Sequence, residues 1–183
     1  MLYPPFFWES VAVIATAVLL RSSRRNLLVG EYIIGVCYGI FWEFSAQNHF
    51  NYQGFTVYIQ TVPIAIPLLW GVVIASFVLI SDSILRYLKT ESLSIRLITD
   101  IIVAATLGIS MEYLGSHQLE MWSYPPNVER LPILDVPLAW VKGWIIIGIT
   151  VVTIARVYDE IIDQRISAWL TRKHKNRHHH THI

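Results

Sequence analysis

The sequence predicts an all-α integral membrane protein with about five transmembrane helices and an internal repeat of two helices. Of its 183 residues, 54% are hydrophobic and only 15% are charged, which is typical of proteins embedded in a bilayer. Several apolar stretches approach the ~20 residues that a helix needs to cross ~30 Å of hydrocarbon. They cover residues 6–20, 27–46, 62–80, 97–114 and 136–157. In addition, one pattern of acidic and small residues recurs sixty-nine positions further along the chain.

The first stretch, residues 6–20, is expected to form an anchor helix, and residues up to 26 a basic loop. No basic residue precedes this stretch, whereas Arg21, Arg24 and Arg25 follow it. A cleaved signal peptide has the opposite order of charge, so this helix is expected to stay in the membrane.

The other four stretches form the repeat, with one copy in residues 27–81 and the other in 96–158. The first copy carries the stripe Glu31, Gly35, Gly39 and Glu43. The second carries Asp100, Ala104, Gly108 and Glu112. Small residues four apart let transmembrane helices approach closely, either within a chain or between copies in a homo-oligomer. The single domain 1–183 then ends in a tail, residues 159–183.

Basic residues define the expected orientation, because they concentrate on cytoplasmic loops. Those between the first and second and between the third and fourth helices are Arg21, Arg24, Arg25, Arg86, Lys89 and Arg96. Loops 47–61 and 115–135 contain only Arg130 as a fixed positive charge and should face outward. The N-terminus is then expected outside the cell membrane and the C-terminal tail in the cytoplasm.

The acids at the two ends of each stripe have different expected roles. Glu31 and Asp100 should lie near the cytoplasmic interface, where water and arginines satisfy them. Glu43 and Glu112 lie ~18 Å further along their helices, toward the outer leaflet. Acids inside transmembrane segments are costly and usually face a cavity or a partner, so these two are the candidate catalytic residues. A structural hydrogen-bonding role is the alternative.

Aromatic residues follow each candidate acid and are the expected substrate-binding residues. They are Trp42, Phe50, Tyr52 and Trp70 in the first copy and Tyr113, Trp122, Tyr124 and Trp140 in the second. An apolar wall disfavours a charged carboxylate, so a glutamic acid there can keep its proton and act as an acid. The faces of aromatic rings attract cations. A protonated glutamic acid beside aromatic rings can therefore protonate an alkene, and the rings can stabilise the carbocation that forms. The alternative is an ordinary interfacial belt of Trp and Tyr.

Asp135 is a third candidate, between Pro132 and Pro137 at the start of the last helix. It is expected to be either an N-terminal cap or a third acid facing the same cavity. The sequence offers no phosphate-binding glycine loop, no cysteine pair and no fixed histidine spacing for a metal, so no cofactor is expected. Nucleic-acid binding is not expected either, because the net charge is +1.

These features resemble those of membrane carotenoid-biosynthesis proteins of the carotenoid hydratase type. They resemble more loosely the small membrane lycopene cyclases and other intramembrane terpene cyclases. The resemblance covers residues 28–145 and rests on Glu43 through Trp70 and Glu112 through Trp140. It implies protonation of an isoprenoid double bond, followed by hydration or ring closure, without a redox cofactor. The paired glutamates of the cyclases are absent, because Leu138 and Ala139 follow Pro137.

Two other functions remain open from the sequence. A small transporter or lipid-binding protein would use the acids to bind protons or a solute between the repeats. A scaffold for other membrane enzymes would instead depend on the tail. The expected partner is a membrane lipid or an isoprenoid substrate, and the sequence leaves open whether the protein forms a homo-oligomer.

Overall fold

The computed structural model describes residues 3–22, 27–46, 49–90 and 92–179. In this part the chain is mostly helical, with α1 (Phe7–Ser22), α2 (Leu27–Ala46), α3 (Ala65–Leu88), α4 (Leu93–Tyr113) and α5 (Leu138–His179). One π-helical turn, η2 (Leu114–Gln118), extends α4. Arg24, Arg25 and the last four residues of the histidine-rich tail lie outside the described residues.

Within the described residues, three helical segments are long and apolar enough to cross a membrane. They are Ala65–Leu88, Leu93–Gln118 and Leu138–Tyr158. The third, fourth and fifth predicted helices therefore have the length and composition of membrane spans. Helix α1 has 16 residues and α2 has 20 residues.

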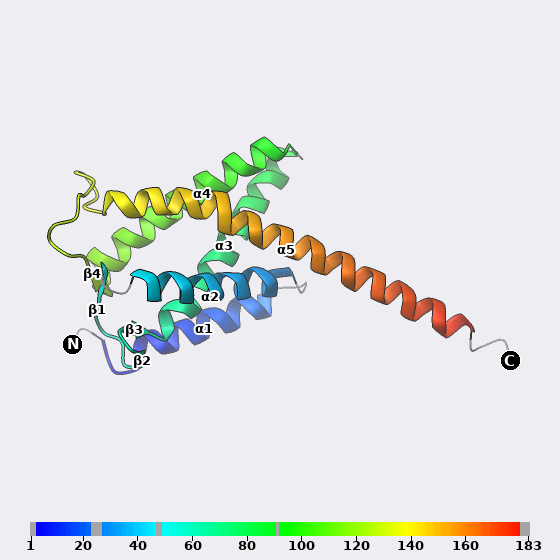
Figure 1. Ribbon diagram of the computed structural model, residues 1–183, viewed down its shortest axis with the longest axis horizontal. Coiled ribbons are helices and arrows are strands. Elements are labelled where there is room, and N and C mark those ends of the chain that lie inside the picture. The colour runs from blue at the N-terminus through cyan, green and yellow to red at the C-terminus, as the bar shows by residue number, and fades with distance from the viewer. Residues whose placement is uncertain (1–2, 23–26, 47–48, 91, 180–183) are drawn as a thin grey trace.

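Some helices continue beyond the apolar stretches that predicted them. Helix α3 ends at Leu88 and α4 begins at Leu93, so the expected loop of roughly fifteen residues reduces to a short connection. Helix α5 runs on to His179 and projects far beyond the other helices (Figure 1). Backbone hydrogen bonds sustain a helix in water as well as in lipid, whereas an apolar stretch marks only the part suited to hydrocarbon.

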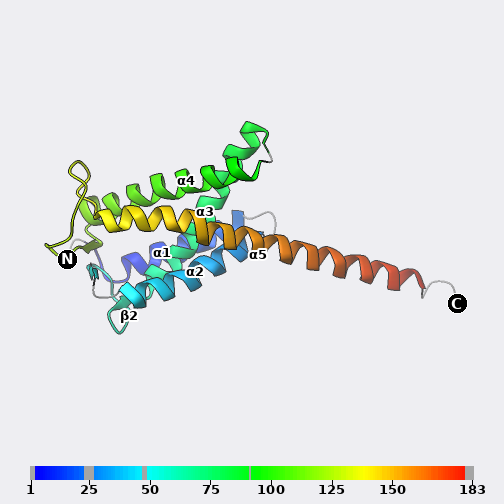
Figure 2. The same ribbon diagram turned by 45° about the horizontal axis from the view of Figure 1, so that its top comes forward.

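The helices form two antiparallel pairs that pack on each other. Helix α2 packs on α3 and α4 packs on α5, while α2 contacts α5 and α3 contacts α4 across the two pairs. Helix α1 lies mainly against α3. In both views the strands gather at one end of the helices, and the last part of α5 extends alone beyond the other end (Figures 1 and 2).

Small residues of both stripes lie in the contacts within each pair. A Cβ added at Gly35 would come within 2.7 Å of the backbone oxygen of Trp70 and 2.8 Å of Cα of Gly71. In the other pair, a Cβ at Gly148 would lie 3.1 Å from the Cβ of Ala104. Backbones approach closely at both places, so the stripes serve packing within the chain.

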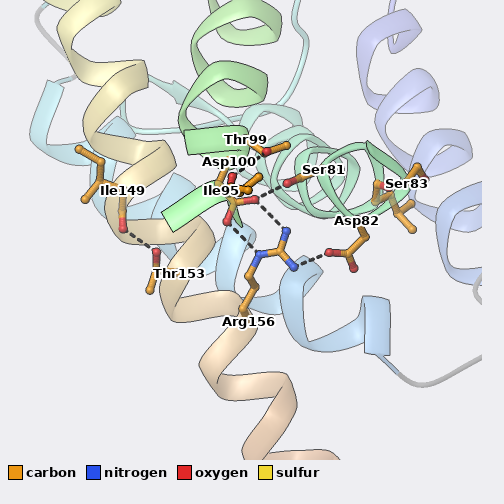
Figure 3. A network of polar contacts seen from close by, with 10 residues as sticks. Ser81, Asp82, Ser83, Ile95, Thr99, Asp100, Ile149, Thr153 and Arg156 are labelled. Carbon is orange, nitrogen blue, oxygen red and sulfur yellow. Dashed lines mark hydrogen bonds and ion pairs between the residues drawn. The ribbon is translucent and has the colours of Figure 1, made fainter. Parts of the chain in front are cut away.

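A buried ion network joins three helices at the end of the bundle away from the strands (Figure 3). Arg156 of α5 donates to both carboxylate oxygens of Asp100 on α4, at 3.0 and 2.8 Å, and also to Asp82 on α3. Ser81 adds a further hydrogen bond to Asp100, whose side chain is 2% exposed. The expectation that an arginine satisfies Asp100 is therefore confirmed, although the contact is buried.

Short strands connect the α2–α3 loop and the α4–α5 loop at the opposite end. Strand β1 (Asn51–Tyr52) pairs antiparallel with β4 (Trp122–Ser123), so that Asn51 lies opposite Ser123. Strands β2 (Tyr58–Ile59) and β3 (Val62–Pro63) form a hairpin just before α3. The pairing of β1 with β4 fixes the position of the aromatic residues that follow the two candidate acids.

Candidate active site

Glu43 is held near the end of α2 by donors from two other elements. Its side chain is buried, with 3% of the residue exposed. The phenol of Tyr52 on β1 donates to Oε2, and the indole Nε1 of Trp70 on α3 donates to Oε1 at 2.7 Å. Each carboxylate oxygen thus has its own donor, which fixes the orientation of the side chain.

Glu112 near the end of α4 has a matching set of partners. It is 7% exposed. The phenol of Tyr124 donates to Oε2, and Nε1 of Trp144 on α5 donates to Oε1 at 3.2 Å. In addition, Nε1 of Trp122 donates to the Tyr124 oxygen at 2.9 Å. Burial and the neighbouring glutamate hold the pKa of the Tyr52 and Tyr124 phenols above the usual range, so both remain hydrogen-bond donors.

Both glutamates line one cavity of about 260 Å³. Four of the predicted substrate-binding residues line it as well, namely Phe50, Tyr52, Trp70 and Trp122. Most other wall residues are apolar, with Trp8 and Val11 coming from α1. The indoles of Trp70 and Trp144 stack on each other with ring centroids 5.0 Å apart. The cavity therefore combines two buried carboxyl groups with an aromatic lining.

Two glycines make room for the indoles that hold the carboxyl groups. A Cβ on Gly39 would lie 2.6 Å from the Trp70 side chain, and one on Gly108 would lie 2.1 Å from the Trp144 ring. No larger residue fits at either position without displacing the indole. These stripe glycines therefore shape the site in addition to packing the helices.

The remaining predicted aromatic residues lie outside this cavity. Trp42, Tyr124 and Trp140 line a second cavity of about 360 Å³ between the C-terminal end of α2 and the N-terminal end of α5. Tyr124 still contributes to the first site through its bond to Glu112. Tyr113 instead stacks on His117, with ring centroids 5.0 Å apart.

The structure places Asp135 on the exposed surface of the loop that precedes α5. Its carboxylate accepts from Arg130 at 2.8 Å and contacts Nε2 of His117 at 3.2 Å, and it is not among the residues lining either cavity. The hydrogen bonds from His117 and Arg130 hold the pKa of Asp135 below its usual value. The expectation of a third acid facing the cavity is therefore wrong, because these two partners draw the carboxylate outward.

Sequence reasoning missed two aromatic residues of the site. Trp144 lies one helical turn after Trp140, the residue matched to Trp70 by sequence, and takes the structural role of Trp70 toward Glu112. Trp8 belongs to α1, which the repeat does not include. No group of three or more His, Cys, Asp or Glu residues that could hold a metal ion occurs in the described part of the chain. Comparison with protein-family models, curated proteins and solved structures found no match.

Proposed function

We propose that the protein is a five-span enzyme of the cell membrane, built from a two-helix repeat, that protonates an isoprenoid double bond. Helices α3, α4 and α5 have the length and composition of spans. Helices α1 and α2 complete the bundle, because they run beside the others and pack against α3. The charge pattern favours an outer N-terminus and a cytoplasmic C-terminus.

The proposed repeat is supported by residues that correspond between the copies and meet in space. Asn51 pairs with Ser123 in the strands, Trp70 stacks on Trp144, and Asp82 is bonded to Arg156. The contacts between pairs are matched too, since α2 packs on α5 as α3 packs on α4. Such contacts between equivalent residues are expected along a two-fold axis that relates two parallel repeats.

The observation that carries the proposed activity is the shared cavity of Glu43 and Glu112. The two acids lie sixty-nine positions apart in the sequence, yet both face one mostly apolar space with aromatic walls. A hydrophobic cavity suits an apolar substrate, and convergent polar groups in such a cavity are typical of an active site. Mutual repulsion of two carboxylates in this setting favours a state in which one of them carries a proton.

In the proposed reaction, the protonated carboxyl group acts as a general acid. The π electrons of the alkene take the proton and form a new C–H bond, while the O–H bond breaks and leaves a carboxylate. The positive charge then rests on the more substituted alkene carbon. The aromatic lining of the cavity, together with the new carboxylate, stabilises this cation.

The second carboxylate acts as the base that completes the reaction. For hydration it takes a proton from a water molecule as the oxygen bonds to the cation, so the product gains one water. For cyclisation a second double bond attacks the cation, and loss of a proton gives an isomer of unchanged mass. The resemblance to carotenoid hydratases and lycopene cyclases includes both outcomes, and neither requires a redox cofactor.

A carrier is the second candidate, favoured by the position of the acids between the two helix pairs. The packing below the cavity supports the enzyme instead. Ile74, Phe77, Val151 and Val152 fill the space toward the ion network and are each at most 4% exposed. A transported solute would have to pass this apolar core, whereas a lipid-soluble substrate can enter from the bilayer.

The proposal is tested by mass spectrometry of apolar lipids from cells that make linear isoprenoids. Cells with the intact protein should accumulate a product that is either one water heavier or an isomer. Glu43→Gln and Glu112→Gln should each reduce its formation by at least ~100-fold, because general acid–base groups contribute ~10²–10⁴-fold. Glu129→Gln changes an exposed glutamate and should leave the product level unchanged. An unchanged product level in the Glu43→Gln/Glu112→Gln double variant would overturn the proposal.

A further inference from the structure

A second cavity of about 360 Å³ lies next to the proposed active site. It is bounded by the outer ends of α2 and α5, with Trp42 and Trp140 as its largest walls. Its polar wall residues include Ser45 and His49. His49 lies edge-on to Trp140, with ring centroids 6.1 Å apart.

A partition only one side chain thick separates this space from the cavity of the two acids. Phe50 lines the first cavity and stacks on Trp140 of the second, with ring centroids 5.0 Å apart. Tyr124 lines the second cavity and donates to Glu112 of the first. The rings of Phe50 and Tyr124 are themselves 5.9 Å apart. Phe50 and Tyr124 therefore form the partition between the two spaces.

The chemistry of the second cavity favours a neutral oxygen atom in a ligand. No Lys, Arg, Asp or Glu is among the described residues that line it, so a phosphate would find no counter-charge. Arg130 lies 6.0 Å from the centre of the Tyr124 ring, but its guanidinium is bonded to Asp135. The Ser45 hydroxyl donates to the backbone oxygen of Phe41 at 2.7 Å and keeps its lone pairs for an external donor. The imidazole of His49 supplies a donor for an external oxygen.

The size of the first cavity also points to a second binding region. At about 260 Å³ it lies slightly below the ~300–1,000 Å³ of most small-molecule sites. It can hold the reacting end of an isoprenoid but not a long chain. The second cavity is the adjacent space that could hold a further part of a long substrate, because only the rings of Phe50 and Tyr124 lie between it and the first cavity.

We infer that the second cavity binds the oxygenated end of a long isoprenoid, as a neutral hydroxyl or keto group, while a double bond further along the chain lies at Glu43 and Glu112. This inference rests on the proposed function for the identity of the ligand. A hydroxyl group would donate to Ser45 and accept from His49, and the chain would pass Phe50. The substrate class is thus an isoprenoid alcohol or ketone and not a pure hydrocarbon.

The test measures binding separately from turnover, with the full chain in lipid nanodiscs. The probe is an alcohol of four isoprene units that carries a photoreactive diazirine beside the hydroxyl group. It should label peptides that contain Ser45, His49 or Trp140. The unlabelled alcohol should compete about tenfold better than the hydrocarbon of equal length, the effect expected of one or two hydrogen bonds. In Ser45→Ala/His49→Leu this preference should fall to about one.

A matched control is Ser110→Ala, since Ser110 is exposed and donates to the backbone oxygen four residues earlier, as Ser45 does. Ser110→Ala should keep the roughly tenfold preference for the alcohol over the hydrocarbon. Labelling confined to the first cavity or spread over lipid-facing helices would overturn the inference, as would an equal competition by alcohol and hydrocarbon. Labelling of the second cavity without any product in the cell assay would contradict the proposed reaction but uphold the second binding site.

Discussion

Each candidate acid is held by residues that lie far from it in the sequence. Glu43 needs Tyr52 from a strand and Trp70 from the next helix, and Glu112 needs Tyr124 and Trp144 in the same way. A carboxyl group on a helix end would otherwise turn toward the solvent. The four donors thus keep both acids directed at the shared cavity.

The tyrosine donors give a prediction at the level of single residues. Tyr52→Phe and Tyr124→Phe should each lower turnover by ~10–100-fold, because a hydrogen bond to a charged group contributes ~1.5–3 kcal/mol. The binding of substrate should change much less, since the phenols contact the acids. Steady-state rates of product formation at several substrate concentrations separate the two effects. A loss confined to substrate affinity would contradict this role.

The raised pKa values of the Tyr52 and Tyr124 phenols lead to a prediction for the alkaline titration of the protein. Burial raises their pKa values above the usual ~10, so they stay neutral while an ordinary phenol ionises. Tyr52→Phe/Tyr124→Phe should therefore leave the phenolate absorbance that develops near pH ~10 unchanged. Tyr87→Phe, which changes a residue that is 86% exposed, should reduce it. Because the folded-state pKa is raised, the stability contributed by these phenols is present below pH ~10 and is lost as the pH rises further.

Some residues of the site could be predicted from the sequence and others could not. The repeat identified Glu43 and Glu112 together, and the aromatic spacing identified Tyr52 and Tyr124. Trp144 could not be assigned from the sequence. The loop before α5 is longer than the loop before α3, so α5 begins about one helical turn later in its copy of the repeat than α3 does in the other copy. Asp135 was misassigned because its partner His117 lies in another element.

At the scale of helices, a small residue determines where each indole can lie. Gly108→Ala should push the Trp144 ring away from Glu112, because the new Cβ would meet the ring at 2.1 Å. Such overpacking typically costs ~1–3 kcal/mol, so we expect both a lower thermal midpoint and lower activity. Gly143→Ala is the matched control on α5, since a Cβ there meets nothing within 4 Å. It should be neutral or stabilising by up to ~1 kcal/mol, because alanine favours the helix.

Equal thermal midpoints of Gly108→Ala and Gly143→Ala would contradict this account of the helix contact. The sequence predicted the stripes but left open whether they pack within the chain or between copies. The structure resolves this, because Gly35 faces α3 and Ala104 faces Gly148. Helix ends were harder to predict than helix centres, because polar residues interrupt an apolar stretch without ending the helix.

For the whole molecule, Arg156 of α5 connects α3 and α4, although it lies 56 positions from Asp100 and 74 positions from Asp82 in the sequence. Its guanidinium, with a side chain 14% exposed, bridges Asp100 on α4 and Asp82 on α3 (Figure 3). The sequence predicted that Asp100 would be satisfied near an interface, but it gave no signal for the partner on α5. That contact depends on how the two helix pairs are packed against each other.

Removal of Arg156 should therefore weaken the packing of both helix pairs. In Arg156→Ala the carboxylate of Asp100, which is 2% exposed, would lose both bonds to the guanidinium. Breaking a buried ion pair from one side typically costs ~3–5 kcal/mol, so the thermal midpoint in detergent should fall clearly. Asp100→Asn/Arg156→Leu removes both charges and should recover much of this loss, because the penalty comes mainly from the unpaired charge.

Arg96→Ala supplies the control for net charge, because Arg96 is an exposed residue of α4. It should leave the thermal midpoint unchanged, as expected for a surface substitution. If Arg156→Ala and Arg96→Ala melted alike, the network would contribute no more than a surface ion pair. A large loss in Arg156→Ala that the double variant recovers would instead establish that the loss comes from the carboxylate of Asp100, which is left buried without its partner.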